Sequence, residues 1–345
     1  MKKIVFSGGG SAGHVIPNIA LIEQLKNEFK IAYIGTDGIE EKICKANGVE
    51  FYRFDAVKFV RGKILCNLAI PFKLIKSIKQ AGKLIDQIKP DLVFCKGGYV
   101  CIPPAFAANK RKIPVLTHES DISAGLANKI IASKCKKVLT TFPTTAKQFK
   151  NGIYTGSPMR TAIFDRDKKI AREHLNLDNR PTLIVFGGGS GSKIINKNIR
   201  DVAFEVCKRV NIIHICGKGN KIESNINGYK QIEFADDMGL IYACADGAVA
   251  RCGSNSANEL IALKIPTLFI PLQNSSSRGD QVKNAEYFCE KGLCRVLAEK
   301  QLTPNYLKSE IYKLFGDIKL KTTLGKSCVE CGNKRIIKEI KAALQ

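Results

Sequence analysis

The feature that most constrains the fold is a repeated junction between an apolar segment and a glycine-rich turn. Residues 3–7 run into Gly8-Gly9-Gly10-Ser11, and residues 183–186 run into Gly187-Gly188-Gly189-Ser190. A helical pattern follows each turn, as at the start of a Rossmann-like unit. The two junctions stand about half a chain apart. The 345-residue sequence is therefore predicted to form two Rossmann-like α/β domains.

Further short runs of β-branched and apolar residues alternate with helical patterns along both halves. Their spacing is typical of βα units, which form parallel sheets covered by helices on both faces. Strands are predicted at residues 31–34, 92–94, 115–117, 138–141, 183–186, 212–215, 247–250 and 267–270. Glycine and proline in residues 156–159 indicate a boundary between a domain of residues 1–158 and one of residues 159–330. A last helix, over residues 330–345, is expected to pack back on the first domain.

The charge of the chain narrows the class of partner. The net charge is +24, and the surplus is larger in residues 1–160 than in the remainder. Such an imbalance indicates an anionic partner, which can be a nucleic acid, a membrane surface or a phosphorylated ligand. Aromatic residues make up 8% of the chain and are mostly Phe within apolar runs. The stacking surface that single-stranded nucleic acid requires is therefore not predicted.

One stretch concentrates the positive charge. Between Asp55 and Asp86 the chain has no acidic residue, and residues 58–83 interleave Lys and Arg with large apolar side chains. A helix with Pro71 in its first turn is expected to reach Ile88. We expect residues 58–83 to bind an anionic membrane surface; a core-packed helix with a solvated lysine face is the alternative. Neither a signal peptide nor a run of ~18 apolar residues is found, so a soluble or peripheral protein is expected.

The first glycine-rich turn is a candidate anion site. Gly8-Gly9-Gly10-Ser11-Ala12-Gly13-His14 stands between a predicted strand and a helix predicted over residues 17–25. Glycine lets the backbone approach an oxyanion closely, and the amino terminus of the helix adds partial positive charge. The spacing matches neither a P-loop nor the dinucleotide-binding fingerprint, which disfavours an NTPase and a dehydrogenase. His14 is the candidate base at the mouth of the turn.

A second candidate site follows the strand that ends at residue 250. Gly253, Ser254, Asn255 and Ser256 lead into a helix, and their N–H and hydroxyl groups are suited to hold a diphosphate without a metal. Glu259, one to two turns into that helix, is placed to accept hydrogen bonds from a ribose diol. Other polar side chains also follow predicted strands, at the edge where parallel sheets bind ligands. These are Tyr99, Glu119 and Asp121. The pair Asp280 and Gln281, after residues 275–279, offers paired polar groups to sugar hydroxyls, with a surface turn as the alternative.

Several segments, in order along almost the whole chain, resemble the MurG family of glycosyltransferases. The matching segments are GGGSAGHV (8–15), KGGYV (96–100), HESD (118–121), GLANK (125–129), GSPMR (156–160), FADDM (234–238), RCGSNSANE (251–259) and RGDQ (278–281). The SAGH and HESD segments are closest to the branch from low-GC Gram-positive bacteria. The resemblance implies the GT-B architecture, in which two Rossmann-like domains face each other across a cleft.

The resemblance also implies a reaction. The donor is UDP-N-acetylglucosamine, the acceptor is lipid I, and the product, lipid II, forms with inversion and without a metal or a cofactor. Other enzymes with this architecture, a diacylglycerol glucosyltransferase or a UDP-sugar epimerase, are the alternatives. By matching position, the donor contacts are Arg160, the backbone around Ala235, Ser254, Asn255, Ser256, Glu259, Asp280 and Gln281. The acceptor side comprises Ser11, Ala12, Gly13, His14, Tyr99, Glu119 and Asp121, with His14 the first candidate base and Glu119 the second.

Three positions depart from the family pattern. The serine that the family has at position 189 stands at Ser190 here, after Gly189. Asp121 and Asp280 stand where many members have Asn and Gln. The donor contact of the second glycine-rich turn is therefore expected at Gly189 or Ser190.

Overall fold

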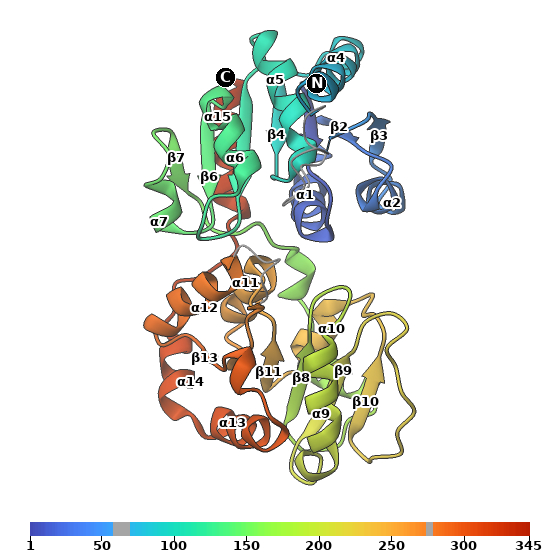
Figure 1. The fold of residues 1–345 in the computed structure, drawn as a ribbon, viewed down its shortest axis with the longest axis vertical. Coiled ribbons are helices and arrows are strands. Elements are labelled where there is room, and N and C mark those ends of the chain that lie inside the picture. The colour runs from blue at the N-terminus through green and yellow to red at the C-terminus, as the bar shows by residue number, and fades with distance from the viewer. Residues whose placement is uncertain (58–69, 274–278) are drawn as a thin grey trace. The chain divides into compact units, whose positions relative to one another are not determined.

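In the computed structural model, described over residues 1–57, 70–273 and 279–345, the chain divides into two compact units. One unit comprises Met1–Arg160 together with Cys331–Gln345, and the other comprises Thr161–Glu330 (Figure 1). Each unit contains one sheet in which all neighbouring strands are parallel. The α/β class and the parallel sheets predicted from the sequence are confirmed.

The first unit has a seven-stranded sheet in the order β3-β2-β1-β4-β5-β6-β7. Its strands are β1 Lys3–Ser7, β2 Lys30–Gly35, β3 Glu50–Arg53, β4 Leu92–Cys95, β5 Val115–Glu119, β6 Lys137–Thr140 and β7 Gly152–Tyr154. The strand order reverses between β1 and β4, which is where doubly wound sheets bind ligands. The register pairs Ser7 with Cys95, so the segments that follow β1 and β4 emerge side by side.

Alternation along the strands divides the first unit into two hydrophobic layers. Val5 and Val93 point to one face, which α4 Ile70–Ile88, α5 Ile102–Lys110 and α6 Leu126–Ile131 cover. Phe6 and Phe94 point to the other face, which α1 Ala12–Leu25, α2 Ile39–Ala46 and α15 Asn333–Leu344 cover. The short helices α7 Pro143–Ala146, η1 Tyr99–Cys101 and η2 Ala132–Lys134 complete this unit. The carboxyl-terminal α15 thus contributes Ile336 and Ile340 to the core of the first unit.

The second unit has a six-stranded sheet in the order β10-β9-β8-β11-β12-β13. Its strands are β8 Thr182–Phe186, β9 Asn211–Ile215, β10 Tyr229–Ile232, β11 Gly247–Ala250, β12 Thr267–Phe269 and β13 Arg295–Val296. Its helices are η3 Thr161–Ile163, α8 Lys168–His174, α9 Lys193–Val206, α10 Met238–Ala243, α11 Ser254–Ala262, α12 Asp280–Glu290, η4 Glu299–Gln301, α13 Pro304–Gly316 and α14 Ile318–Gly325. The strand order again reverses next to the strand that precedes the glycine-rich turn, here between β8 and β11.

Two predicted helices have different outcomes. The first helix begins at Ala12 rather than at residue 17, because Ser11 adopts the extended N-cap conformation and Pro17 lies inside the helix. Ala12, Gly13 and His14 therefore form its first turn. The helix predicted to contain Pro71 and to end at Ile88 is confirmed as α4, whereas residues 58–69 of the predicted anchor lie outside the described residues. Of the helices in the described ranges, none combines the length and the apolar character needed to cross a membrane.

Candidate functional site

The first glycine-rich turn is packed so closely that side chains are excluded at its centre. Gly10 has φ +78°, and a Cβ atom there would lie 2.8 Å from Cε1 of Tyr99. Gly98, which follows β4, would place a Cβ 2.5 Å from the carbonyl oxygen of Gly9. Both values are shorter than any normal van der Waals contact. The close approach of the segments after β1 and β4 therefore depends on glycine.

A buried carboxylate supports this turn from behind. Glu40, at the start of α2, has no exposed surface. Its Oε2 accepts a hydrogen bond from the Gly10 amide at 3.3 Å, and its Oε1 accepts one from the Thr36 amide at 3.1 Å. Glu40 could not be found from the sequence, because it belongs to a helix about thirty residues beyond the turn and no local pattern connects the two.

His14 lies half-buried in the first turn of α1, beside the glycine-rich turn. Its Nδ1 is 2.9 Å from the carbonyl oxygen of Gly9 and 3.1 Å from Oγ of Ser11. A carbonyl only accepts, so a neutral ring in this position carries its proton on Nδ1. The lone pair is then on Nε2, and this nitrogen is the one that can take up a proton.

Buried charged groups gather at the ends of β4 and β5. Lys96 is 1% exposed, and its Nζ donates to Oγ of Ser120. Burial lowers the pKa of Lys96 to about 8, against the opposing attraction of Glu119 and Asp121. Although Lys96 opens one of the quoted family segments, its burial and its contact with Ser120 could not be found from the sequence.

Glu119 is buried, and both of its oxygens are engaged. Oε1 accepts from the Asp121 amide at 3.0 Å, and Oε2 accepts from the Gly125 amide at 2.7 Å and from Nδ2 of Asn128 at 2.8 Å. Burial raises the pKa of Glu119, and these hydrogen bonds oppose that shift. The arrangement fixes the loop that contains Asp121, which is itself half-buried.

The second glycine-rich turn lies in the other unit, between β8 and α9. Gly188 and Gly191 have φ values of +91° and +76°. A Cβ on Gly191 would lie 2.0 Å from the carbonyl oxygen of Cys216, so this turn packs directly against the end of β9. Gly189, in contrast, has no atom within 4 Å of a Cβ position, and Ser190 is exposed. The tip of the turn is therefore accessible to a ligand.

Arg251 connects the segments that follow β8, β11 and β12. It is 8% exposed; its Nη2 donates to Oγ of Ser192 at 2.9 Å, and its Nη1 donates to the carbonyl oxygen of Ile270 at 2.9 Å. It also forms an ion pair with Glu299. Although Arg251 opens one of the quoted family segments, its role could not be found from the sequence, because its partners are distant along the chain.

The predicted diphosphate loop is the start of α11. Gly253 occupies the N-cap position, Ser254 is buried, and Asn255 and Ser256 are half-buried. The first amides of a helix have no acceptor within the helix itself, and such helix starts favour anions. The strand end at residue 250 and the helix that follows are confirmed.

Glu259 lies one turn and a half into α11, as predicted. Its Oε2 accepts a hydrogen bond from the Tyr242 hydroxyl at 2.9 Å. Tyr242 belongs to α10, and Ala235 lies in the loop that precedes this helix. The loop around Ala235 is thus connected to Glu259 through a single helix.

A cavity of about 350 Å³ joins the second glycine-rich turn to the start of α12. Its lining includes Gly187, Gly191, Arg251 and Gln281. Oε1 of Gln281 accepts a hydrogen bond from the Leu272 amide at 3.0 Å, and Asp280 is the first residue of α12. The structure thus brings Gln281 to the second glycine-rich turn, while Glu259 is not among the residues that line the cavity.

Two further observations concern the predicted site residues. Arg160, the last residue before the second unit, is half-buried and forms no hydrogen bond with either glycine-rich turn within the described residues. In the described ranges, no group of three or more His, Cys, Asp or Glu side chains is arranged to hold a metal ion.

Comparisons with known proteins agree over the whole chain. The glycosyltransferase family 28 N-terminal domain matches residues 4–140, and the glycosyltransferase family 28 C-terminal domain matches residues 182–340. A protein of Clostridium novyi is 42% identical over 322 residues, covering 91% of this chain and 90% of its own. A protein of Clostridium kluyveri is 43% identical over 348 residues, covering 98% of both chains. Both are named UDP-N-acetylglucosamine--N-acetylmuramyl-(pentapeptide) pyrophosphoryl-undecaprenol N-acetylglucosamine transferase.

Solved structures share the fold. MurG from Acinetobacter baumannii superposes with a TM-score of 0.78 at 23% identity, covering 99% of this chain and 100% of that chain. The calicheamicin glycosyltransferase CalG4 superposes with a TM-score of 0.74 at 14% identity, covering 100% and 98%. At these identities the superpositions describe the two-domain GT-B fold alone.

Proposed function

This chain belongs to the MurG family within glycosyltransferase family 28, and from that premise we propose that it transfers N-acetylglucosamine from UDP-N-acetylglucosamine to lipid I. Lipid I is undecaprenyl-pyrophosphoryl-N-acetylmuramoyl-pentapeptide, and the product is lipid II, a precursor of peptidoglycan. The observation that carries the proposal is the 43% identity over 98% of both chains to a relative that bears this activity in its name. Neither alternative, a diacylglycerol glucosyltransferase or a UDP-sugar epimerase, has comparable support.

We assign the donor to the second unit. The first amides of α11, with Ser254, Asn255 and Ser256, hold the diphosphate, and Glu259 accepts hydrogen bonds from the ribose diol. Gly189, Ser190 and Gln281 surround the transferred sugar; of these three, Gln281 lines the cavity that joins the second glycine-rich turn to α12. The backbone around Ala235 contacts the nucleobase of the UDP donor. Asp280 and Arg160 complete the donor contacts.

We assign the acceptor to the first unit. The turn of Gly8–His14, with Ser11, Ala12 and Gly13 at the amino terminus of α1, holds the acceptor pyrophosphate through backbone amides. Tyr99 and Asp121 lie on the neighbouring segments that follow β4 and β5. Glu119 accepts three hydrogen bonds, which favours a role in positioning its loop over a role as the catalytic base.

The reaction is a direct displacement. The 4-hydroxyl of the muramoyl sugar attacks the anomeric carbon, the bond from that carbon to the UDP oxygen breaks, and the configuration inverts from α to β. The hydroxyl proton passes to Nε2 of His14, which carries the lone pair when Nδ1 donates to Gly9. Helix amino-terminal amides stabilise the charge that develops on the diphosphate, so no metal is required.

We further propose that α4 attaches the enzyme to the cytoplasmic face of the membrane. Phe72 and Ile75 are 79% and 53% exposed, and Lys76 and Lys79 lie beside them on the same helical face. Apolar groups among cations are typical of helices that bind anionic lipid surfaces. A nucleic-acid partner is not proposed.

The test is a transfer assay with the full chain, labelled UDP-N-acetylglucosamine and a lipid I analogue, in excess EDTA. We expect labelled disaccharide lipid and one equivalent of UDP. Product with diacylglycerol as the acceptor, or conversion of the UDP-sugar to its epimer without any acceptor, would replace the proposal with one of the alternatives. A requirement for added Mg²⁺ or Mn²⁺ would contradict the metal-free mechanism.

A further inference from the structure

A second cavity in the second unit lies at the amino-terminal ends of the strands of its sheet. Its volume is about 660 Å³, and its lining includes Pro181, Asp246 and Pro266, which immediately precede β8, β11 and β12. The glycine-rich turn, Arg251 and the segment after β12 follow the other ends of the same strands. Since the donor is assigned to the carboxyl ends of these strands, this cavity is separate from the donor site.

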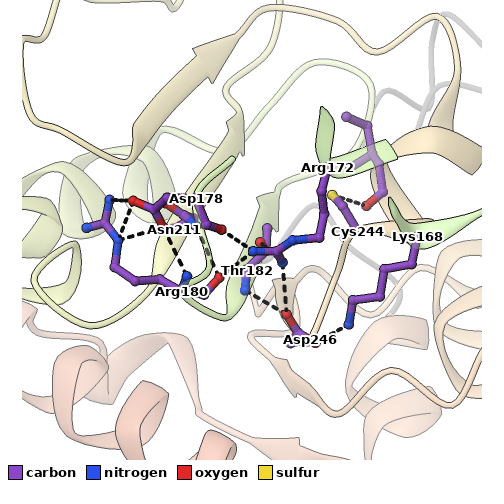
Figure 2. A network of polar contacts seen from close by, with 9 residues as sticks. Lys168, Arg172, Asp178, Arg180, Thr182, Asn211, Cys244 and Asp246 are labelled. Atoms are coloured by element: carbon purple, nitrogen blue, oxygen red, sulfur yellow. Dashed lines mark hydrogen bonds and ion pairs between the residues drawn. The ribbon is translucent and has the colours of Figure 1, made fainter. Parts of the chain in front are cut away.

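Cations dominate the charged lining of this cavity. Among the described residues, the basic lining residues are Lys168, Arg172, Lys264 and Lys321, and the only acidic one is Asp246. Asp246 forms ion pairs with Lys168 and, at 3.7 Å, with Arg172, and it also accepts a hydrogen bond from the Thr182 amide at 2.9 Å (Figure 2). The lining therefore carries four positive charges and the single negative charge of Asp246. The oxygens of this carboxylate already interact with Lys168, Arg172 and the Thr182 amide.

Two of the four cations are oriented by the backbone. Nζ of Lys264 donates to the carbonyl oxygen of Ser327 at 2.5 Å, and Nζ of Lys321 donates to the carbonyl oxygen of Phe315 at 2.7 Å. A carbonyl acceptor fixes the position of an ammonium group but does not neutralise its charge. The two lysines thus present charge at set positions in the lining, next to the apolar surfaces of Phe315 and Pro266.

Lys264 shares a left-handed backbone conformation with Lys89 and Lys112. It follows the C-cap of α11 with φ +60°, in the left-handed region where glycine is the preferred residue. Glycine would adopt this conformation at a lower cost in free energy, but lysine adds an ammonium group to the cavity lining.

We propose that this cavity binds a small organic polyanion. Its phosphate or carboxylate oxygens would contact Lys264 and Lys321, and its carbon skeleton would pack against Phe315 and Pro266. Arg172 would add its charge alone, because its Nη groups already bond Thr182 and the carbonyl oxygens of Asp178 and Arg180. The volume lies within the range of small-ligand sites, and the cavity is open to solvent on one side. The proposal is independent of the transferase activity.

The conformation of Lys264 supplies a favourable test variant. Lys264→Gly removes the charge and places glycine where the left-handed backbone prefers it, so the variant should fold at least as well as the parent. Lys112→Gly is the matched control, since Lys112 follows the C-cap of α5 with φ +59° and lies in the other unit. Both variants lose one positive charge and gain one glycine. Lys321→Gln gives a second, conformationally neutral test.

Binding is measured by calorimetry with inorganic triphosphate and, separately, citrate, in the presence of saturating UDP to occupy the donor site. Apart from any triphosphate held at the acceptor turn of Gly8–His14, which neither cavity variant should affect, we expect one equivalent of one probe to bind the parent protein. The preferred probe distinguishes phosphate from carboxylate chemistry. Lys264→Gly and Lys321→Gln should each weaken binding roughly threefold to tenfold, whereas Lys112→Gly should not change it. Absence of binding to the parent at millimolar concentrations of both probes, or equal losses in Lys264→Gly and Lys112→Gly, would overturn the proposal.

Discussion

The carboxylate of Glu40 occupies the space that a side chain at Gly9 would need. A Cβ atom on Gly9 would lie 2.5 Å from Oε1 of Glu40, while Oε2 accepts a hydrogen bond from the amide of the next residue, Gly10. The same buried group therefore excludes a side chain from the turn and fixes its backbone. Gly189, in the corresponding turn of the second unit, has no such neighbour.

The contrast between Gly9 and Gly189 gives a stability prediction. Gly9→Ala should lower the free energy of unfolding by about 1–3 kcal/mol, because the new methyl group displaces a buried, hydrogen-bonded carboxylate. Gly189→Ala should leave stability almost unchanged. Urea denaturation of both variants checks this, and in a Glu40→Ala background the cost of Gly9→Ala should shrink. Equal costs in both backgrounds would show that the two residues are not coupled.

Arg251 should affect donor binding through the segments that it connects. Arg251→Lys keeps the charge but loses the planar group that bonds Ser192 and Ile270 together, so the donor KM should rise roughly tenfold. Arg295→Lys is the control, because Arg295 pairs with Glu310 and Asp317 at the edge strand β13. It should lower the melting temperature without changing the donor KM. If both variants raised the donor KM by the same factor, Arg251 would only stabilise the fold.

Glu259 is expected to hold the donor ribose, oriented by Tyr242. Glu259→Ala should raise the donor KM roughly tenfold to a hundredfold, since two hydrogen bonds to a charged group are lost, and should leave the acceptor KM unchanged. Tyr242→Phe removes only the orienting hydroxyl, so its effect should have the same direction and be smaller. Steady-state kinetics with each substrate varied checks both. A folded Glu259→Ala enzyme with an unchanged donor KM would remove this residue from the site.

The burial of His214 leads to a prediction of how the free energy of unfolding responds to acid. It is fully buried between the Tyr229 hydroxyl and Asn196, and burial, with a smaller contribution from Arg200, lowers its pKa to about 4. Between pH 6.5 and 4 the unfolded chain binds this proton and the folded chain does not, so stability falls as the pH decreases through that window. The free energy of unfolding should fall by roughly 3 kcal/mol through this histidine, with no further loss from it below pH 4.

Two variants isolate this contribution. Urea denaturation between pH 4 and 7 should show a flatter pH dependence for His214→Gln than for the parent. The exposed His174 gives the control, and His174→Gln should retain the slope of the parent. Identical slopes for all three proteins would mean that His214 is protonated equally in the folded and unfolded states.

The membrane proposal makes a prediction about α4. Reversing Lys73, Lys76 and Lys79 to Glu should abolish most binding to anionic vesicles and reduce turnover of membrane-embedded acceptor, but spare a short-chain soluble acceptor. The same charge change at exposed Lys218, Lys221 and Lys230 of the second unit should have little effect. High salt should weaken binding of the parent without eliminating it, because screening acts on the lysines and not on Phe72. If the α4 variant still sediments with anionic vesicles like the parent, α4 is not the anchor.

The sequence predicted the inner strands of both sheets and missed all the edge strands. The inner strands, such as β4 and β11, are buried along their whole length and read as continuous apolar runs. The edge strands β3, β7 and β13 are two to four residues long and only partly buried, and β10 alternates between buried and more exposed residues. A strand with one neighbour and little buried surface has no composition that distinguishes it from a loop.

The same difference applies to the candidate site. Gly8–His14 and Gly253–Glu259 could be found because their chemistry is contiguous along the chain. Glu40, Lys96 and Arg251 act through partners that folding brings near, such as Gly10, Ser120 and Ser192. Nothing in the neighbourhood of these residues along the chain indicates such partners.

The return of α15 to the first unit has a consequence for biosynthesis. Ile336 and Ile340 fill one face of a core whose other members, such as Ile4 and Ile19, lie far earlier in the chain. The ribosome must therefore synthesise all of Thr161–Glu330 before the segment that closes this core emerges. At ordinary elongation rates the nascent first unit spends on the order of ten seconds or more with that apolar face uncovered. Throughout this interval its core is incomplete, and we expect the exposed apolar face to need protection from aggregation.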